Sequence, residues 1–130
     1  MTSHRILIVD DNAVNRRVAE CLVRALGFEA DAVQSGWEAI EAVKANPYYL
    51  ILMDLQMPGM DGMEAARQIR LLVAPEPPIV ACSTSEPEQT RWQERMDGFL
   101  EKPLSIRNLA DVLQRWHPDR PVPIPEIPRS

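Results

Sequence analysis

The sequence predicts an α/β fold in which helices cover both faces of a five-stranded parallel sheet. Short apolar runs of strand length alternate five times with segments of helical periodicity along the 130 residues. Alternation of this kind is typical of right-handed βαβ crossovers, which place helices on both sides of a parallel sheet. A chain of this length can bury a core without disulfides or a structural metal. We therefore expect one doubly wound domain.

The first strand and helix have the clearest pattern. Residues 6–9 form a continuous apolar run, which is typical of a strand covered on both faces. Residues 12–26 follow as a helix, and Gly27 stands where a glycine commonly ends one. Apolar residues recur along this helix at helical spacing: Val14, Val18, Leu22 and Ala25.

The second unit is marked by its boundaries more than by its apolar pattern. Residues 29–34 alternate weakly and predict a strand. Ser35 and Glu38 form a capping-box pattern that opens a helix, and this helix must end before Pro47.

The third unit follows the same order. Residues 48–53 are apolar and predict a buried strand, and residues 61–73 predict a helix. The prolines in residues 75–78 then interrupt the chain before the next strand. Four residues of this helix are expected to face the core: Met63, Ala66, Ile69 and Val73.

The last two units are shorter. Residues 79–82 and 99–101 predict strands. The helix between them, at about residues 85–96, has few large apolar residues, so we expect it to pack loosely. A final helix is predicted at about residues 105–116.

Composition excludes several functions. The net charge of -5 and the scattered arginines argue against direct nucleic-acid binding. No apolar stretch reaches the roughly 20 residues that span a bilayer, so we expect a domain without membrane contact. Cys21 and Cys82 are interpreted as small core residues and not as a disulfide or metal pair, which fits a reducing, cytoplasmic setting. Five prolines among residues 118–130 indicate a tail or linker after a domain at residues 1–117.

Polar side chains follow the strands at the edge where ligands of such sheets bind. Four residues follow the ends of predicted strands: Asp10, Asp11, Asp54 and Ser83. Clustered carboxylate oxygens suit a hard cation such as Mg²⁺, and the spacing of His and Cys that zinc sites need is absent from the sequence. The alternative for the first acid pair is simple capping of the following helix.

Three motifs together resemble the receiver domain of two-component response regulators, which has a flavodoxin-like, chemotaxis-type fold. They are the acid pair at Asp10, the Asp54 segment ending in Met-Pro-Gly-Met-Asp-Gly at residues 57–62, and Lys102 followed by Pro103. The resemblance extends from Arg5 to about residue 116. It implies the strand order 2-1-3-4-5 and five helices.

The resemblance also implies a role for each residue of the site. Asp11 and Asp54 would bind Mg²⁺ directly, together with the backbone carbonyl of Gln56. Asp10 would act mostly through a bound water.

Phosphoryl chemistry is assigned to three residues by the same resemblance. Asp54 would accept the phosphoryl group, and Ser83 and Lys102 would contact its oxygens. A carboxylate can attack phosphorus if the charge on the phosphoryl oxygens is neutralised, which Mg²⁺ and the Lys102 ammonium would do. The peptide between Lys102 and Pro103 is cis in the family.

Switching and docking residues are likewise implied. Phe99 would swing inward when the Ser83 hydroxyl engages phosphate, with plain core packing as the alternative. Ser83 stands where threonine is usual, and the segment 83–102 is about three residues shorter than in many relatives, so the switch is less clearly specified than the chemistry. A donor would dock on Asn15, Val18 and Leu104; for the last two, core packing is the alternative.

The leading hypothesis is a domain that takes a phosphoryl group from phosphohistidine onto Asp54, catalyses its own phosphorylation and slow hydrolysis, and then changes its affinity for a partner. The donor would be a histidine kinase or a histidine phosphotransfer protein, because neither His4 nor His117 has the surroundings of a phosphotransfer histidine. Residues 11–16 and the motif at residues 102–104 resemble receivers of hybrid sensor kinases more than those fused to DNA-binding domains.

Two alternatives remain at this stage. A Mg²⁺-dependent phosphatase with an aspartyl-phosphate intermediate normally has a second Asp two residues after the nucleophile, whereas this chain has Gln56. A phosphorylation-independent interaction module would have no need of the complete acid set.

Overall fold

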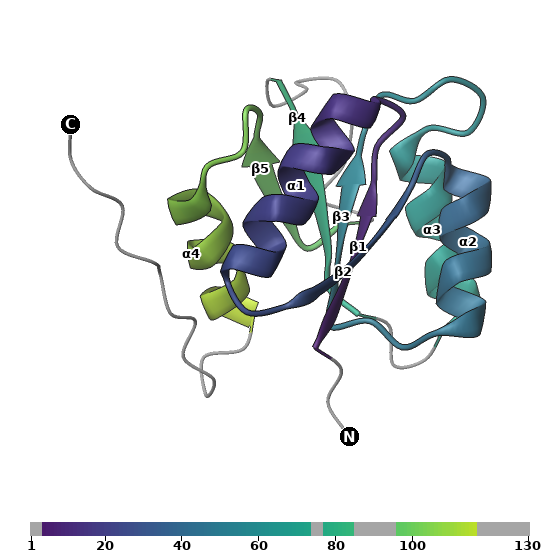
Figure 1. The fold of residues 1–130 in the computed structure, drawn as a ribbon. Coiled ribbons are helices and arrows are strands. Elements are labelled where there is room, and N and C mark those ends of the chain that lie inside the picture. The colour runs from purple at the N-terminus through teal and green to yellow at the C-terminus, as the bar shows by residue number, and fades with distance from the viewer. Residues whose placement is uncertain (1–3, 74–76, 85–95, 117–130) are drawn as a thin grey trace, which may run out of the picture.

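The computed structural model describes residues 4–73, 77–84 and 96–116. In this part of the chain, five strands form one parallel sheet in the order β2-β1-β3-β4-β5, and four helices cover it (Figure 1). The predicted sheet and strand order are confirmed. Of the fifth helix expected at about residues 85–96, residues 85–95 lie outside the described residues, as does the tail expected at 118–130.

All five predicted strands are present, and their bounds differ from the expected ones by no more than two residues. Each adjacent pair runs parallel, as βα connections require. The central strand β3 begins two residues later than predicted and includes Asp54 as its last residue. The strands are β1 Arg5–Val9, β2 Glu29–Val33, β3 Leu50–Asp54, β4 Ile79–Ser83 and β5 Gly98–Glu101.

The two faces of the sheet bury separate apolar cores. Helices α1 (Ala13–Ala25) and α4 (Ile106–Trp116) cover one face, and α2 (Gly36–Ala45) and α3 (Gly62–Leu72) cover the other (Figure 1). Alternate residues of β1 supply both cores, with Ile8 on the first face and Leu7 on the second. A strand buried on both faces explains the continuous apolar runs of β1, β3 and β4.

The helices begin at the capping residues that the sequence contains. Ser35 Oγ accepts from the Glu38 amide at 3.2 Å, which confirms half of the predicted capping box. The Glu38 carboxylate accepts from the amide of Gln34, one residue before the cap. Asp61 caps α3 in the same way, accepting from the Glu64 amide at 2.9 Å.

The expectation that Cys21 is a core residue of α1 is wrong, and the apolar residues of this helix do not all lie on its buried face. Val14 and Val18 are 70% and 45% exposed, because the helix buries the face that carries Ala19 and Val23. Cys21 is exposed and is not a core residue, whereas Cys82 is buried in β4 as predicted. The apolar residues of α1 recur on more than one face, so helical spacing alone does not identify the buried one.

The inward face of α3 agrees with the prediction. Ala66 and Ile69 are buried, and Met63 and Val73 pack against the same core while partly buried. No helix among the described residues is long and apolar enough to cross a membrane.

Candidate functional site

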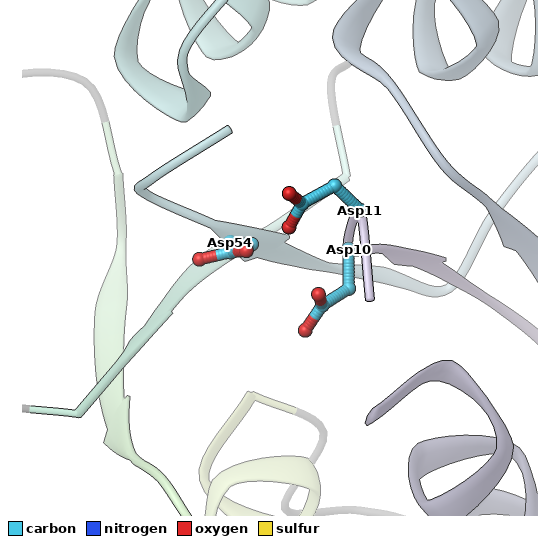
Figure 2. A group of neighbouring side chains, drawn as sticks. All are labelled: Asp10, Asp11 and Asp54. Carbon is cyan, nitrogen blue, oxygen red and sulfur yellow. The ribbon is translucent and has the colours of Figure 1, made fainter. Parts of the chain in front are cut away.

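Three polar side chains are buried at the carboxyl edge of the sheet, where β1, β3 and β4 end. Asp10, Asp54 and Ser83 are 5%, 6% and 5% exposed, and they are the buried polar or charged residues of the described chain. Asp11 is exposed beside them. Figure 2 shows the three carboxylates around one space beyond the strand ends. Their nearest oxygens all lie within 4.8 Å of one another.

Asp10, which follows β1, is held by contacts with β2, with its own loop and with α1. Its amide donates to the Val33 carbonyl at 3.2 Å, and its Oδ1 accepts from the Asn12 amide at 2.9 Å. Arg16 Nη1, from α1, donates to the Asp10 carbonyl oxygen at 2.8 Å. The second carboxylate oxygen, Oδ2, accepts from Lys102, so the Asp10 side chain is fixed at both oxygens.

Asp54 has a perturbed acidity. Burial raises the pKa of its carboxyl to about 6, against the lowering effect of the Gln56 amide and of the Lys102 charge. The Gln56 amide donates to Asp54 Oδ1 at 3.1 Å. Asp54 therefore remains mostly ionised at neutral pH while being poorly solvated.

Lys102 brings a cation to both buried acids. Its Nζ lies 2.7 Å from Asp10 Oδ2 and 3.5 Å from Asp54 Oδ1. Burial lowers the pKa of Lys102, but the hydrogen bond to Asp10 and the two carboxylate charges outweigh it, so the pKa is raised and the ammonium stays charged. Its backbone amide donates to the Ser83 carbonyl at 2.7 Å, and the Lys102–Pro103 peptide is cis.

The acid cluster fits a divalent cation. Three carboxylates this close repel one another, and the single ammonium of Lys102 offsets only part of that charge. Mg²⁺ prefers oxygen ligands, and in proteins one or two carboxylates typically bind it directly. Asp10, Asp11 and Asp54 would hold the ion, which would neutralise the acids and polarise a phosphoryl group.

The predicted docking residues come together beside this cluster. Asn15, Val18 and Leu104 line one pocket of about 110 Å³, which also reaches Asp10 and Lys102. Val18 is exposed, whereas Leu104 is partly buried against the core. The alternative of core packing therefore applies to Leu104 and not to Val18. The pocket therefore joins an apolar surface to the charged site.

Phe99 lies in β5, partly buried against the core on the α2 and α3 side. It neighbours Ala81 of β4 in the strand register, two residues before Ser83. Its prediction as a switch residue concerns a movement, so it stays a prediction.

Sequence reasoning missed two contacts of this site. It assigned Lys102 to phosphoryl oxygens and did not foresee its ion pair with Asp10. It noted Arg16 as part of a motif but gave it no role, although the residue holds the loop that carries Asp10. No signal in one sequence identifies a donor to a backbone carbonyl.

Comparison with known proteins gives the family. The model of the response regulator receiver domain matches residues 6–114, which is most of the chain. The chain belongs to the response regulator receiver domain family. Sensor protein GacS of Pseudomonas syringae pv. syringae is 40% identical over 119 residues, which cover 86% of this chain. The match spans only 13% of the length of GacS.

Solved receiver domains share the fold. The receiver domain of the sensor histidine kinase PA1611 from Pseudomonas aeruginosa, solved with a magnesium ion in its active site cleft, superposes with a TM-score of 0.81 at 34% identity, covering 88% of this chain and 98% of that one. The receiver domain of Ssk1, solved with the histidine phosphotransfer protein Ypd1 from Saccharomyces cerevisiae, gives a TM-score of 0.77 at 28% identity, with coverages of 88% and 89%. This receiver domain is thus a signal transduction module of two-component or phosphorelay systems.

Proposed function

We propose that Asp54 accepts a phosphoryl group from a phosphohistidine of a partner protein, with Mg²⁺ as cofactor. One observation carries the proposal. Asp54 ends the central strand, its carboxylate is almost fully buried, and it lies 3.5 Å from a lysine ammonium and within 4.8 Å of two further carboxylates. This set contains a nucleophile, a fixed cation and a metal-binding group in one place.

The transfer step needs little covalent chemistry from the protein. An Asp54 oxygen attacks phosphorus, the phosphorus–nitrogen bond of phosphohistidine breaks, and its electron pair returns to the imidazole ring. Phosphoryl transfer is accelerated mainly by positioning and by neutralising the equatorial oxygens. The Gln56 amide at 3.1 Å from Oδ1 fixes the orientation of the Asp54 carboxylate.

Two residues would contact the transferred group. Lys102 is held near Asp54 by its pairing with Asp10, so its ammonium can neutralise a phosphoryl oxygen with little movement. Ser83 ends β4, next in the sheet to the strand that Asp54 ends, and its hydroxyl would donate to a second oxygen.

Metal binding is divided among the acids and one backbone group. Asp11 and Asp54 would bind Mg²⁺ directly with the Gln56 carbonyl, and Asp10, already bound to Lys102, would act through a water. The magnesium site of the PA1611 receiver domain supports the same cofactor for this chain.

The donor would be a histidine kinase or a histidine phosphotransfer protein. The similarity to GacS and the Ssk1 complex with Ypd1 support this class of partner. The pocket lined by Asn15, Val18 and Leu104 would receive the donor beside Asp10 and Lys102. After transfer, Ser83 and Phe99 would change the affinity of the domain for its next partner.

The test measures covalent phosphate. A small-molecule phosphodonor such as acetyl phosphate, with Mg²⁺, is expected to add one phosphoryl group to the wild type and none to Asp54→Ala. Asp97→Ala is a matched control, because Asp97 is an acid at the opposite end of β4 that binds Arg70 and the Ile79 amide. Equal phosphorylation of Asp54→Ala would contradict the assignment. Multiple turnover of a phosphomonoester would support a phosphatase instead.

A further inference from the structure

The loop between β3 and α3, residues 55–61, holds the Asp54 carboxylate through Gln56. Leu55, Met57 and Met60 of this loop are buried in the core, and the Leu55 amide donates to the Cys82 carbonyl at 3.2 Å. Gln56, Pro58 and Gly59 are exposed between these anchors. The conformation of the exposed residues therefore also depends on contacts with neighbouring elements.

The start of α2 supplies that support. Gly59 has φ +81°, and the Trp37 ring packs where a side chain at this position would lie. A Cβ on Gly59 would be 2.9 Å from Cζ3 and 3.1 Å from Cη2 of Trp37. A Cβ on Gly36 would lie 2.8 Å from the sulfur of Met60. The first turn of α2 therefore packs directly onto the loop at two consecutive loop residues. Figure 1 shows α2 and α3 side by side on this face.

Trp37 contributes little to the core itself. It is 56% exposed, and among the described residues it belongs to neither of the two core clusters. A large aromatic residue at the surface is therefore used for a local contact with the loop. Its loss should change the stability of the whole fold little, since surface substitutions away from the core usually have small effects.

We propose that Trp37 is a positioning residue for phosphoryl acceptance: its ring on Gly59 holds residues 55–61 in the conformation that places Gln56 against the Asp54 carboxylate. The inference rests on the proposed function for its consequence, slower phosphorylation of Asp54. Its structural part, the ordering of Gln56, stands on contacts alone.

The test compares Trp37→Ala, Trp37→Phe and Leu71→Ala in the full chain. Leu71 is a matched control, because it is an apolar side chain of α3 with 74% exposure. We expect the Gln56 amide of metal-free Trp37→Ala to exchange with deuterium about tenfold faster, equivalent to about 1.4 kcal/mol of local opening. Amides of β1 should exchange at the wild-type rate. Trp37→Phe should restore most of the protection, and Leu71→Ala should match the wild type.

A second readout connects the loop to the metal and the reaction. The affinity of Trp37→Ala for Mg²⁺ should be several-fold lower than that of the wild type. Its rate of phosphorylation by acetyl phosphate should also be several-fold lower. Unchanged Gln56 exchange in Trp37→Ala would overturn the proposal, as would equal acceleration at Gln56 and in β1. Exchange is measured without a phosphodonor, so a wild type that is not phosphorylated on Asp54 would contradict the proposed function and leave this comparison intact.

Discussion

Lys102 Nζ donates to Asp10 Oδ2 at 2.7 Å, although 92 residues separate the two in the sequence. The pair joins the ends of β1 and β5, which are not neighbours in the sheet. Asp54, at the end of β3, lies between them in the strand order and 3.5 Å from the same ammonium. One lysine ammonium therefore forms ion pairs with two buried carboxylates.

Removing Lys102 should leave these acids without their cation. In Lys102→Ala, the rate of phosphorylation by acetyl phosphate should fall on the order of 100-fold, the usual effect of deleting one group that stabilises developing charge. The pKa of Asp54 should rise above its value of about 6, because the lowering effect of the lysine charge is lost. Rate measurements and carbon-13 NMR titration of the Asp54 carboxyl check both. A rate within twofold of the wild type would contradict the role given to Lys102.

The raised pKa of Asp54 predicts a pH dependence of stability without Mg²⁺. An unfolded Asp has a pKa of about 3.9, whereas Asp54 in the fold has about 6. The folded state binds this proton more tightly than the unfolded state does. Protonation of Asp54 therefore contributes its full stabilisation below about pH 4, and this contribution is lost as pH rises through about 6. Asp54→Asn has no carboxyl to ionise, so its free energy of unfolding does not fall in this way. Urea unfolding at several pH values should therefore show the variant gaining on the wild type between pH 4 and 7, and parallel curves would refute the shift.

Magnesium should stabilise the folded domain through its acid cluster. At a concentration ten times its Kd, Mg²⁺ should add about 1.4 kcal/mol and raise the melting temperature of the wild type by about 5 °C. Asp11→Asn should lose most of this gain, because it removes a proposed ligand. Asp111→Asn, which changes an exposed acid of α4, should keep it. Thermal melts with and without Mg²⁺ decide the matter, and an equal gain in both variants would exclude Asp11 as a ligand.

Gly62 is required where α3 begins against β3. A Cβ at this position would collide with the carbonyl oxygen of Asp54. Gly62→Ala should therefore destabilise the domain by about 1–3 kcal/mol and slow phosphorylation by displacing Asp54. Gly98→Ala is the control, since its Cβ would meet its nearest atoms at ordinary contact distances of 3.7–4.0 Å. Urea unfolding should separate the two variants, and equal stability would contradict this account of the contact.

Much of the fold follows from the sequence because its strands are buried on both faces. Such strands must be apolar throughout, and the runs in β1, β3 and β4 are short enough to be recognised as strands. The helix starts were predictable where a capping residue accepts from an amide three residues later, as Ser35 and Asp61 do. The buried face of α1 was not, because Val14 and Val18 lie at the same helical spacing as Ala19 and Val23.

Part of the site could also be predicted from the sequence, and part could not. Asp10, Asp54 and Ser83 were predictable because the carboxyl ends of parallel strands share one edge. The ion pair of Lys102 with Asp10 and the contact of Trp37 with Gly59 depend on distances between elements far apart in the chain. Neither leaves a pattern in a single sequence, so only coordinates reveal them.

Chemical trapping can identify the residue that accepts the phosphoryl group. Borohydride reduces an acyl phosphate to an alcohol, so it converts a phosphorylated aspartate into homoserine, which mass spectrometry of peptides can locate. After treatment of the wild type with acetyl phosphate and Mg²⁺, homoserine is expected at position 54 and nowhere else. Homoserine at Asp10 or Asp11, or its absence from position 54 in a protein that has gained phosphate, would contradict the assignment of Asp54 as the acceptor.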